Sequence, residues 1–142
     1  MLVAAVEISA QDGGSKKEGT MAYVDGFIVP VPKRKVAAYA RMSRKAGKVW
    51  MDHGALDYWE CVGDDVPYGK RTSFPRSVKV KSGETVFFSW IMYRNRAARN
   101  RINAKVMKDP RLASMMNPKN LPFDAKRMIY GGFKSKVHLK SS

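Results

Sequence analysis

The stretch that decides the fold is Glu84-Thr-Val-Phe-Phe-Ser-Trp-Ile-Met-Tyr93, the most apolar run in the chain. Its β-branched and aromatic side chains fit a pleated sheet and no Gly or Pro interrupts it, so it predicts a central β-strand. Side chains alternate along a strand. One face is therefore wholly apolar (Val86, Phe88, Trp90, Met92), and the other is mixed (Thr85, Phe87, Ser89, Ile91, Tyr93). We expect helices to cover the apolar face, and a second protein surface or a pocket to meet the mixed face.

Segments on both sides of this run alternate between strand and helix patterns. Strands are predicted at 23–31, 56–62 and 127–134, with a short edge strand at 77–81; helices are predicted at 33–52, from the cap Asn95 onward, and from Asp109-Pro110. The main elements follow the order βαββαβ, typical of a ferredoxin-like α+β fold with helices on one face of an antiparallel sheet. Burying the other face against a second copy predicts a homodimer.

The composition is that of one soluble domain. The 142 residues carry a formal charge of +15, and one cysteine, Cys61, excludes an internal disulfide and fits a reducing, cytoplasmic location. No run is long enough for a membrane span, so we expect no membrane partner. Residues 1–20 are expected to be a flexible leader or extension before Met21, and residues 21–142 a single domain. Because the leader holds more acidic than basic residues, the positive charge belongs to the domain.

Many short segments resemble, in unbroken order, the YbaA-like family of bacterial proteins. They are Tyr23-Val-Asp-Gly-Phe27, Lys45-Ala-Gly-Lys-Val-Trp50, His53-Gly-Ala-Leu56, Asp64-Asp-Val-Pro67, Thr72-Ser-Phe-Pro75, Glu84-Thr-Val86, Phe88-Ser-Trp90, Lys105-Val-Met-Lys-Asp-Pro-Arg111, Pro122-Phe-Asp124 and Arg127-Met-Ile-Tyr-Gly-Gly-Phe133. The resemblance implies a cytosolic protein with a dimeric α/β barrel and no established biochemical function. It brings no catalytic residues with it, and the leader lies outside the pattern.

Few known chemistries leave marks in this sequence. It lacks a glycine-rich phosphate loop, and two histidines with one cysteine give no metal-ligand spacing, so we expect no metal and no cofactor. Five polar or aromatic residues on or beside buried surface are candidate ligand-binding residues: Asp25, His53, Glu60, Trp90 and Tyr93. The connection from Asp64 to Pro75 is the candidate lid, through Asp64, Asp65, Tyr68 and Phe74. Each candidate equally suits a structural role: Asp25 as a hydrogen-bond acceptor, His53 as a helix end.

Two functions from different classes remain open. The first is a homodimeric small-molecule-binding protein or cofactor-independent enzyme, with a pocket between sheet and helices in which a buried carboxyl holds a proton near neutral pH. The alternative is a basic RNA-associated protein that uses the arginines and lysines of both helices. The sequence lacks an RNP-type aromatic motif or a GXXG clamp, which favours the first function.

Overall fold

The structure is a computed structural model that describes residues 22–115 and 117–142. The predicted leader and the proposed start at Met21 lie outside these residues. Nothing in the structure therefore bears on the division of the chain at residue 21.

The fold is built on one four-stranded antiparallel sheet. Its strands are β1 (Tyr23–Pro32), β2 (Asp57–Val62), β3 (Glu84–Tyr93) and β4 (Ile129–Lys134), in the spatial order β2-β3-β1-β4. The central strand β3 has the bounds that the sequence predicted. β1 continues through Pro30 and Pro32, beyond Ile28, where its pairing with β4 ends. The order and the antiparallel pairing confirm the predicted ferredoxin-like α+β class.

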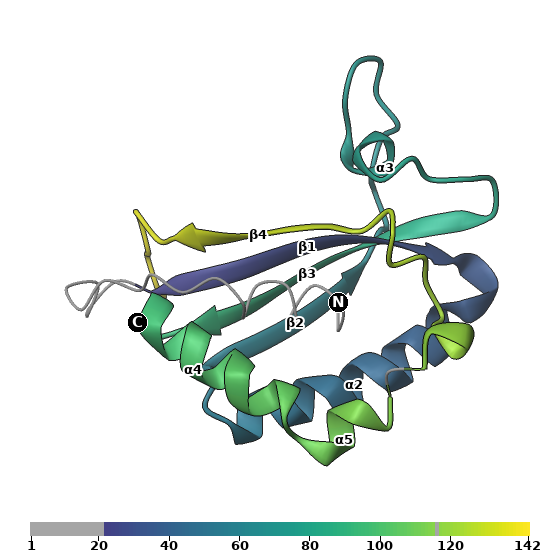
Figure 1. Cartoon of the computed structure of the whole chain (residues 1–142). Helices are drawn as coiled ribbons and strands as arrows, with labels where there is room; N and C mark the ends of the chain where they lie inside the picture. The colour runs from purple at the N-terminus through teal and green to yellow at the C-terminus, as the bar shows by residue number, and fades with distance from the viewer. Residues whose placement is uncertain (1–21, 116) are drawn as a thin grey trace.

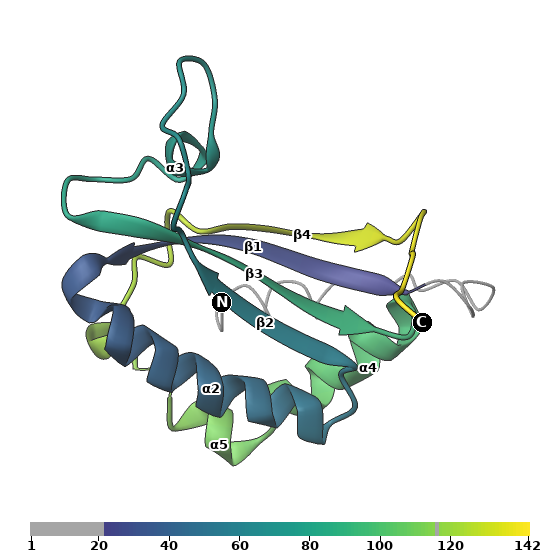
Figure 2. The same ribbon diagram turned by 180° about the vertical axis from the view of Figure 1, so that it is seen from behind.

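Helices cover one face of the sheet (Figures 1 and 2). The long helix α2 (Val36–Asp52) follows a short 3-10 turn, η1 (Lys33–Lys35), and α4 (Arg96–Met107) and α5 (Pro110–Ala113) complete the layer. Asn95 and Asp109 cap α4 and α5 by accepting backbone N–H groups at 2.8 and 2.9 Å, as their residue types predicted. A second 3-10 turn, η2 (Pro118–Asn120), precedes β4.

The assignment of the two faces of β3 from sequence was wrong. The mixed face, with Phe87, Ser89, Ile91 and Tyr93, is the one buried beneath the helices, whereas Phe88 is 45% exposed on the face without helices. A polar atom is tolerated under the helices because it finds a partner: the Tyr93 hydroxyl donates to Asn103 Oδ1 at 3.3 Å. The wholly apolar face is therefore the one that α2, α4 and α5 leave uncovered, and we call it the helix-free face.

The connection between β2 and β3 forms a separate projection. It leaves the sheet on the side opposite to the helices and carries a one-turn helix, α3 (Phe74–Ser77), as Figures 1 and 2 show. The predicted edge strand at 77–81 is wrong, because Ser73 caps α3 through the N–H of Arg76 and the chain then turns at Lys79, whose φ is 50°. The strands at the two edges of the sheet are β2 and β4.

Candidate functional site

A groove between α2 and the edge strand β2 has the properties of a ligand site. It has a volume of about 430 Å³ and lies between the sheet and the helices, where the sequence placed a pocket. Its lining combines apolar side chains with a small polar group: Ala40, Met51, Trp59 and Phe87, together with Ser43, Arg44, Gly47, Tyr58 and Glu60. The groove is thus largely apolar and contains one carboxylate.

Two phenols hold that carboxylate in place. Tyr39 donates to Glu60 Oε1 at 2.9 Å, and Tyr58 donates to Oε2 at 3.2 Å. Burial raises the pKa of Glu60 above 4.5, although the Tyr39 hydrogen bond opposes the shift. Ser43 Oγ is buried without a well-formed hydrogen bond, yet lies close enough to favour the charged carboxylate. The groove therefore offers a carboxyl that exchanges a proton more readily near neutral pH than an exposed glutamate does.

Small residues of α2 let the edge strand approach this closely. The ring of Tyr58 packs against Gly47 so tightly that a Cβ there would lie 2.7 Å from two ring carbons. Gly in a helix normally costs about 1 kcal/mol relative to Ala. At this position the glycine admits the ring, and the ring brings its hydroxyl to Glu60.

Asp25 and Tyr93 meet in a second, fully buried cluster under α4. Asp25 Oδ1 lies 3.3 Å from Arg99 Nε, and Trp50 and Tyr93 both donate to Asn103 Oδ1. Burial raises the pKa of Asp25 to about 6, against the lowering effects of Arg99, Tyr93 and Asn103. Asp25 is 1% exposed and does not line the groove around Glu60, so its surroundings are those of a structural ion pair.

The remaining candidates lie elsewhere. His53 ends α2, with Nε2 2.8 Å from Asp109 Oδ2. Trp90 lies on the helix-free face, stacked on Trp59 with ring centroids 5.5 Å apart. The structure thus places Glu60 alone of the five candidates in the groove between α2 and β2, Asp25 and Tyr93 in the core, and His53 and Trp90 at two other sites.

The predicted lid does not cover this groove. Phe74 packs on Phe88, ring centroids 5.6 Å apart, on the helix-free face, and Asp64 lines a separate depression beside Pro75. Asp65 is exposed, and Tyr68 stacks with the guanidinium of Arg76 within the projection, 4.0 Å from its ring centroid. The sequence of the connection between β2 and β3 did not indicate on which face of the sheet it would lie.

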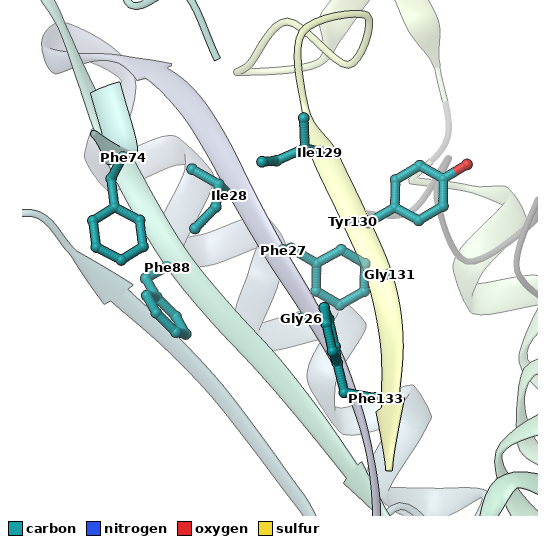
Figure 3. Close-up of a pocket in the computed structure, with 9 residues that line it drawn as sticks. All are labelled: Gly26, Phe27, Ile28, Phe74, Phe88, Ile129, Tyr130, Gly131 and Phe133. Carbon is teal, nitrogen blue, oxygen red and sulfur yellow. The ribbon is translucent and has the colours of Figure 1, made fainter. Parts of the chain in front are cut away.

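The helix-free face holds an apolar depression of about 270 Å³. Phe74 and Phe88 stand at one end, Ile28 and Ile129 lie alongside, and the ring of Phe133 extends toward Gly26 (Figure 3). The glycines of β1 and β4 leave room here for this aromatic ring.

Sequence reasoning missed several residues of both clusters. Arg99 is one of the helix arginines that the RNA alternative would use, but it is 2% exposed. A usable signal was present, because Arg99 shares a helical stripe with Ile102, Asn103 and Val106 at spacings of three, four and seven. No sequence pattern linked Tyr39, Ser43 or Gly47 to Glu60.

The described part of the chain has neither a cluster of metal ligands nor a membrane-spanning helix. Within residues 22–115 and 117–142, no three His, Cys, Asp or Glu side chains gather in a way that would hold a metal ion. Over the same residues, no helix is both long and apolar enough to cross a bilayer.

Comparison with known proteins gives matches over most of the chain. The family model "Protein of unknown function (DUF1428)" matches residues 22–125. The "Uncharacterized protein YbaA" of Escherichia coli K12 and that of Shigella flexneri are each 48% identical over 115 residues, which is 81% of this chain and 97% of the relative. A solved structure of a nipsnap family protein with unknown function from Agrobacterium tumefaciens aligns at a TM-score of 0.51 and 12% identity, over 87% of this chain and 94% of that one.

Proposed function

Starting from the fact that this chain belongs to the DUF1428 family, as the YbaA proteins' 48% identity also indicates, we propose that it is a homodimeric, cytoplasmic small-molecule-binding protein. The proposed ligand site is the groove around Glu60. The family is one of unknown function, so the proposal is based on the chemistry of the site.

The observation that carries the proposal is a carboxylate placed in an open, mostly apolar groove. Met51, Trp59 and Phe87 favour an apolar ligand body, and Glu60 accepts a hydrogen bond or proton from a single polar group. Tyr39 and Tyr58 fix both carboxylate oxygens, so a ligand would meet an acceptor already in position. The predicted ligand class is therefore a small organic molecule with an apolar body and one hydrogen-bond donor.

The same carboxyl supports a cofactor-independent enzyme. A glutamate with a raised pKa is a better general acid or base near neutral pH, and proton transfer needs no further group. A binding protein and an enzyme would use the same site. Conversion of the bound molecule to a product would identify the protein as an enzyme.

The helix-free face supports the homodimer. Trp59 is 49%, Phe88 45% and Phe133 62% exposed, and the two acidic residues that strand alternation places on this face, Asp57 and Glu84, stand at strand ends. Contiguous exposed apolar surface of this kind is typical of an interface. A second copy presents the same uncharged surface, which a two-fold axis pairs with itself.

The ligand site is tested by ligand-observed NMR with a fragment library. Wild type is compared with Glu60→Gln, which keeps the shape of the side chain but removes its charge, and with Asp65→Asn, the same chemical change on the exposed connection. Fragments with an amine or amide donor should bind to wild type and Asp65→Asn and bind at least about tenfold more weakly to Glu60→Gln, a loss of about 1.4 kcal/mol. Equal binding to all three proteins would place the site elsewhere.

The dimer is tested by sedimentation equilibrium. Phe88→Lys puts a charge in the middle of the helix-free face, whereas Leu56→Lys makes the same change at a 53% exposed residue beside α4. We expect wild type and Leu56→Lys to be dimers and Phe88→Lys to be a folded monomer. A monomeric wild type would refute the dimer and leave the groove to be judged on its own test.

A further inference from the structure

A second groove, away from Glu60, gathers positive charge. It lies where the connection from α2 to β2 passes beside α4 and is lined by Arg94, Arg101, Lys105, His53, Gly54 and Ile102, which together we call the basic groove. Arg101 and Lys105 are four residues apart in α4, so the helix repeat brings their side chains to one side of it. Arg94 precedes the N-cap Asn95 and lines the same groove from the end of β3. The volume of the groove is about 190 Å³.

Ordered backbone on both sides gives this groove a defined shape. Gly54 adopts φ 114° at the end of α2, a conformation that favours glycine, and its N–H donates to Met51 O at 3.1 Å. The side chain of Ile102 lies 3.5 Å from where a Cβ of Gly54 would be, so the turn and α4 are in contact. Leu56 N then donates to Met92 O at 2.8 Å, which joins the turn to the sheet. Figures 1 and 2 both place this turn beside α4.

The positive charge of the groove is not neutralised within the described part of the chain. Asp109, which holds His53, also accepts from Arg111 Nη2 at 2.9 Å, and Asp52 pairs with Arg111 and Lys48. No ion pair among residues 22–115 and 117–142 joins a carboxylate to Arg94, Arg101 or Lys105. Arg99 and Arg127, by contrast, each lie within ion-pair distance of a carboxylate, Asp25 and Glu84 respectively.

We propose that the basic groove binds the phosphate group of a small phosphorylated molecule. Two guanidinium groups supply paired N–H donors that match phosphate oxygens, and the lysine adds a point charge. Ile102 and Gly54 give the groove an apolar floor, so water is displaced from one side of a bound anion. This site is independent of the Glu60 groove, and its test does not depend on the proposed function.

The test is an NMR titration of the full-length ¹⁵N-labelled protein with sodium pyrophosphate, compared with sodium chloride at matched ionic strength. Arg101→Gln/Lys105→Gln removes two charges from the groove. Arg41→Gln/Lys45→Gln removes the same two residue types, at the same spacing of four, from the exposed face of α2. All four side chains are exposed, so both double variants should keep the fold.

We expect saturable shifts at residues 53–56 and 94–105, present in wild type and in the α2 variant, and at least about tenfold weaker affinity in the α4 variant. Equal weakening in both variants would show that net charge alone attracts the anion, which overturns the site. Absence of saturation at matched ionic strength overturns it as well. A single-stranded oligonucleotide that binds at this groove when pyrophosphate does not would replace the proposal with the RNA interpretation.

Discussion

Gly47→Ala tests how the Glu60 groove is built, because the added methyl group has two opposite effects on stability. In an exposed helix the added methyl group would stabilise the protein by about 0.5–1 kcal/mol. At Gly47 the new Cβ would lie 2.7, 2.7 and 3.1 Å from three carbons of the Tyr58 ring, where ordinary contacts are about 3.5–4.0 Å. Overpacking of a filled interior costs about 1–3 kcal/mol.

The cost of the steric clash should exceed the gain in helix propensity. We expect Gly47→Ala to lower the free energy of unfolding by about 1 kcal/mol, equivalent to about 4 °C in Tm for a domain of this size. The substitution should also weaken ligand binding in the groove, because Tyr58 carries its hydroxyl to Glu60. Chemical denaturation followed by circular dichroism measures the first effect.

Repeating Gly47→Ala in variants of Tyr58 shows whether the tyrosine ring causes the loss of stability. In Tyr58→Phe the ring remains, so Gly47→Ala should still destabilise. In Tyr58→Ala the ring is gone, and the same change should now stabilise by about 0.5–1 kcal/mol. A stabilising effect of Gly47→Ala in the wild-type protein would refute the packing of Tyr58 on Gly47 and with it the account of the groove.

Two further predictions concern pH. The pKa of Asp25 is raised from 3.8 to about 6 by burial, so the folded state holds this proton more tightly and stability should rise as pH falls from about 7 to about 4. Asp25→Asn should remove about 2 kcal/mol of the gain in stability between pH 7 and pH 4.5, measured by urea titrations at these two values. An equal gain in wild type and Asp25→Asn would show that Asp25 does not titrate in this range. Arg127 donates to both oxygens of Glu84, at 2.8 and 2.6 Å, and these bonds lower the pKa of Glu84. The stabilisation by this ion pair should be present above pH 4.5 and lost as pH falls below it. Glu84→Gln should therefore lower the free energy of unfolding by about 1–3 kcal/mol at pH 7 and by less at pH 3. An equal loss at both pH values would contradict an ionic origin.

The main strands and helix starts could be predicted from sequence, because the residue patterns that specify them are local. The run from Glu84 to Tyr93 has no competing helical period, and the strand found in the structure has those two residues as its ends. Asn95 and Asp109 precede good helix positions, and each accepts the N–H that an N-cap residue accepts. A sequence pattern of this kind needs no knowledge of the neighbours of an element.

What could not be predicted depends on contacts between distant segments. Both faces of β3 are largely apolar, so alternation defines two faces without saying which one the helices cover. Arg99 is buried because it pairs with Asp25 on a strand more than 70 residues earlier, and composition alone places an arginine at the surface. Glu60 was selected as a carboxylate beside buried surface. Its hydrogen bond with Tyr39 could not be predicted, because it depends on the packing of α2 against β2.

The central position of β1 has a consequence for how the chain folds during synthesis. Among the described residues, β1 is the first strand in the chain, and it does not pair with the next strand in sequence: Tyr23 is opposite both Tyr93 and Lys134. One edge of β1 therefore stays open until β3 has emerged, up to residue 93, and the other stays open until β4 has emerged, up to residue 134. Such long-range closure makes folding slow, so a nascent chain truncated before residue 129 would expose an unpaired strand capable of adding to another molecule.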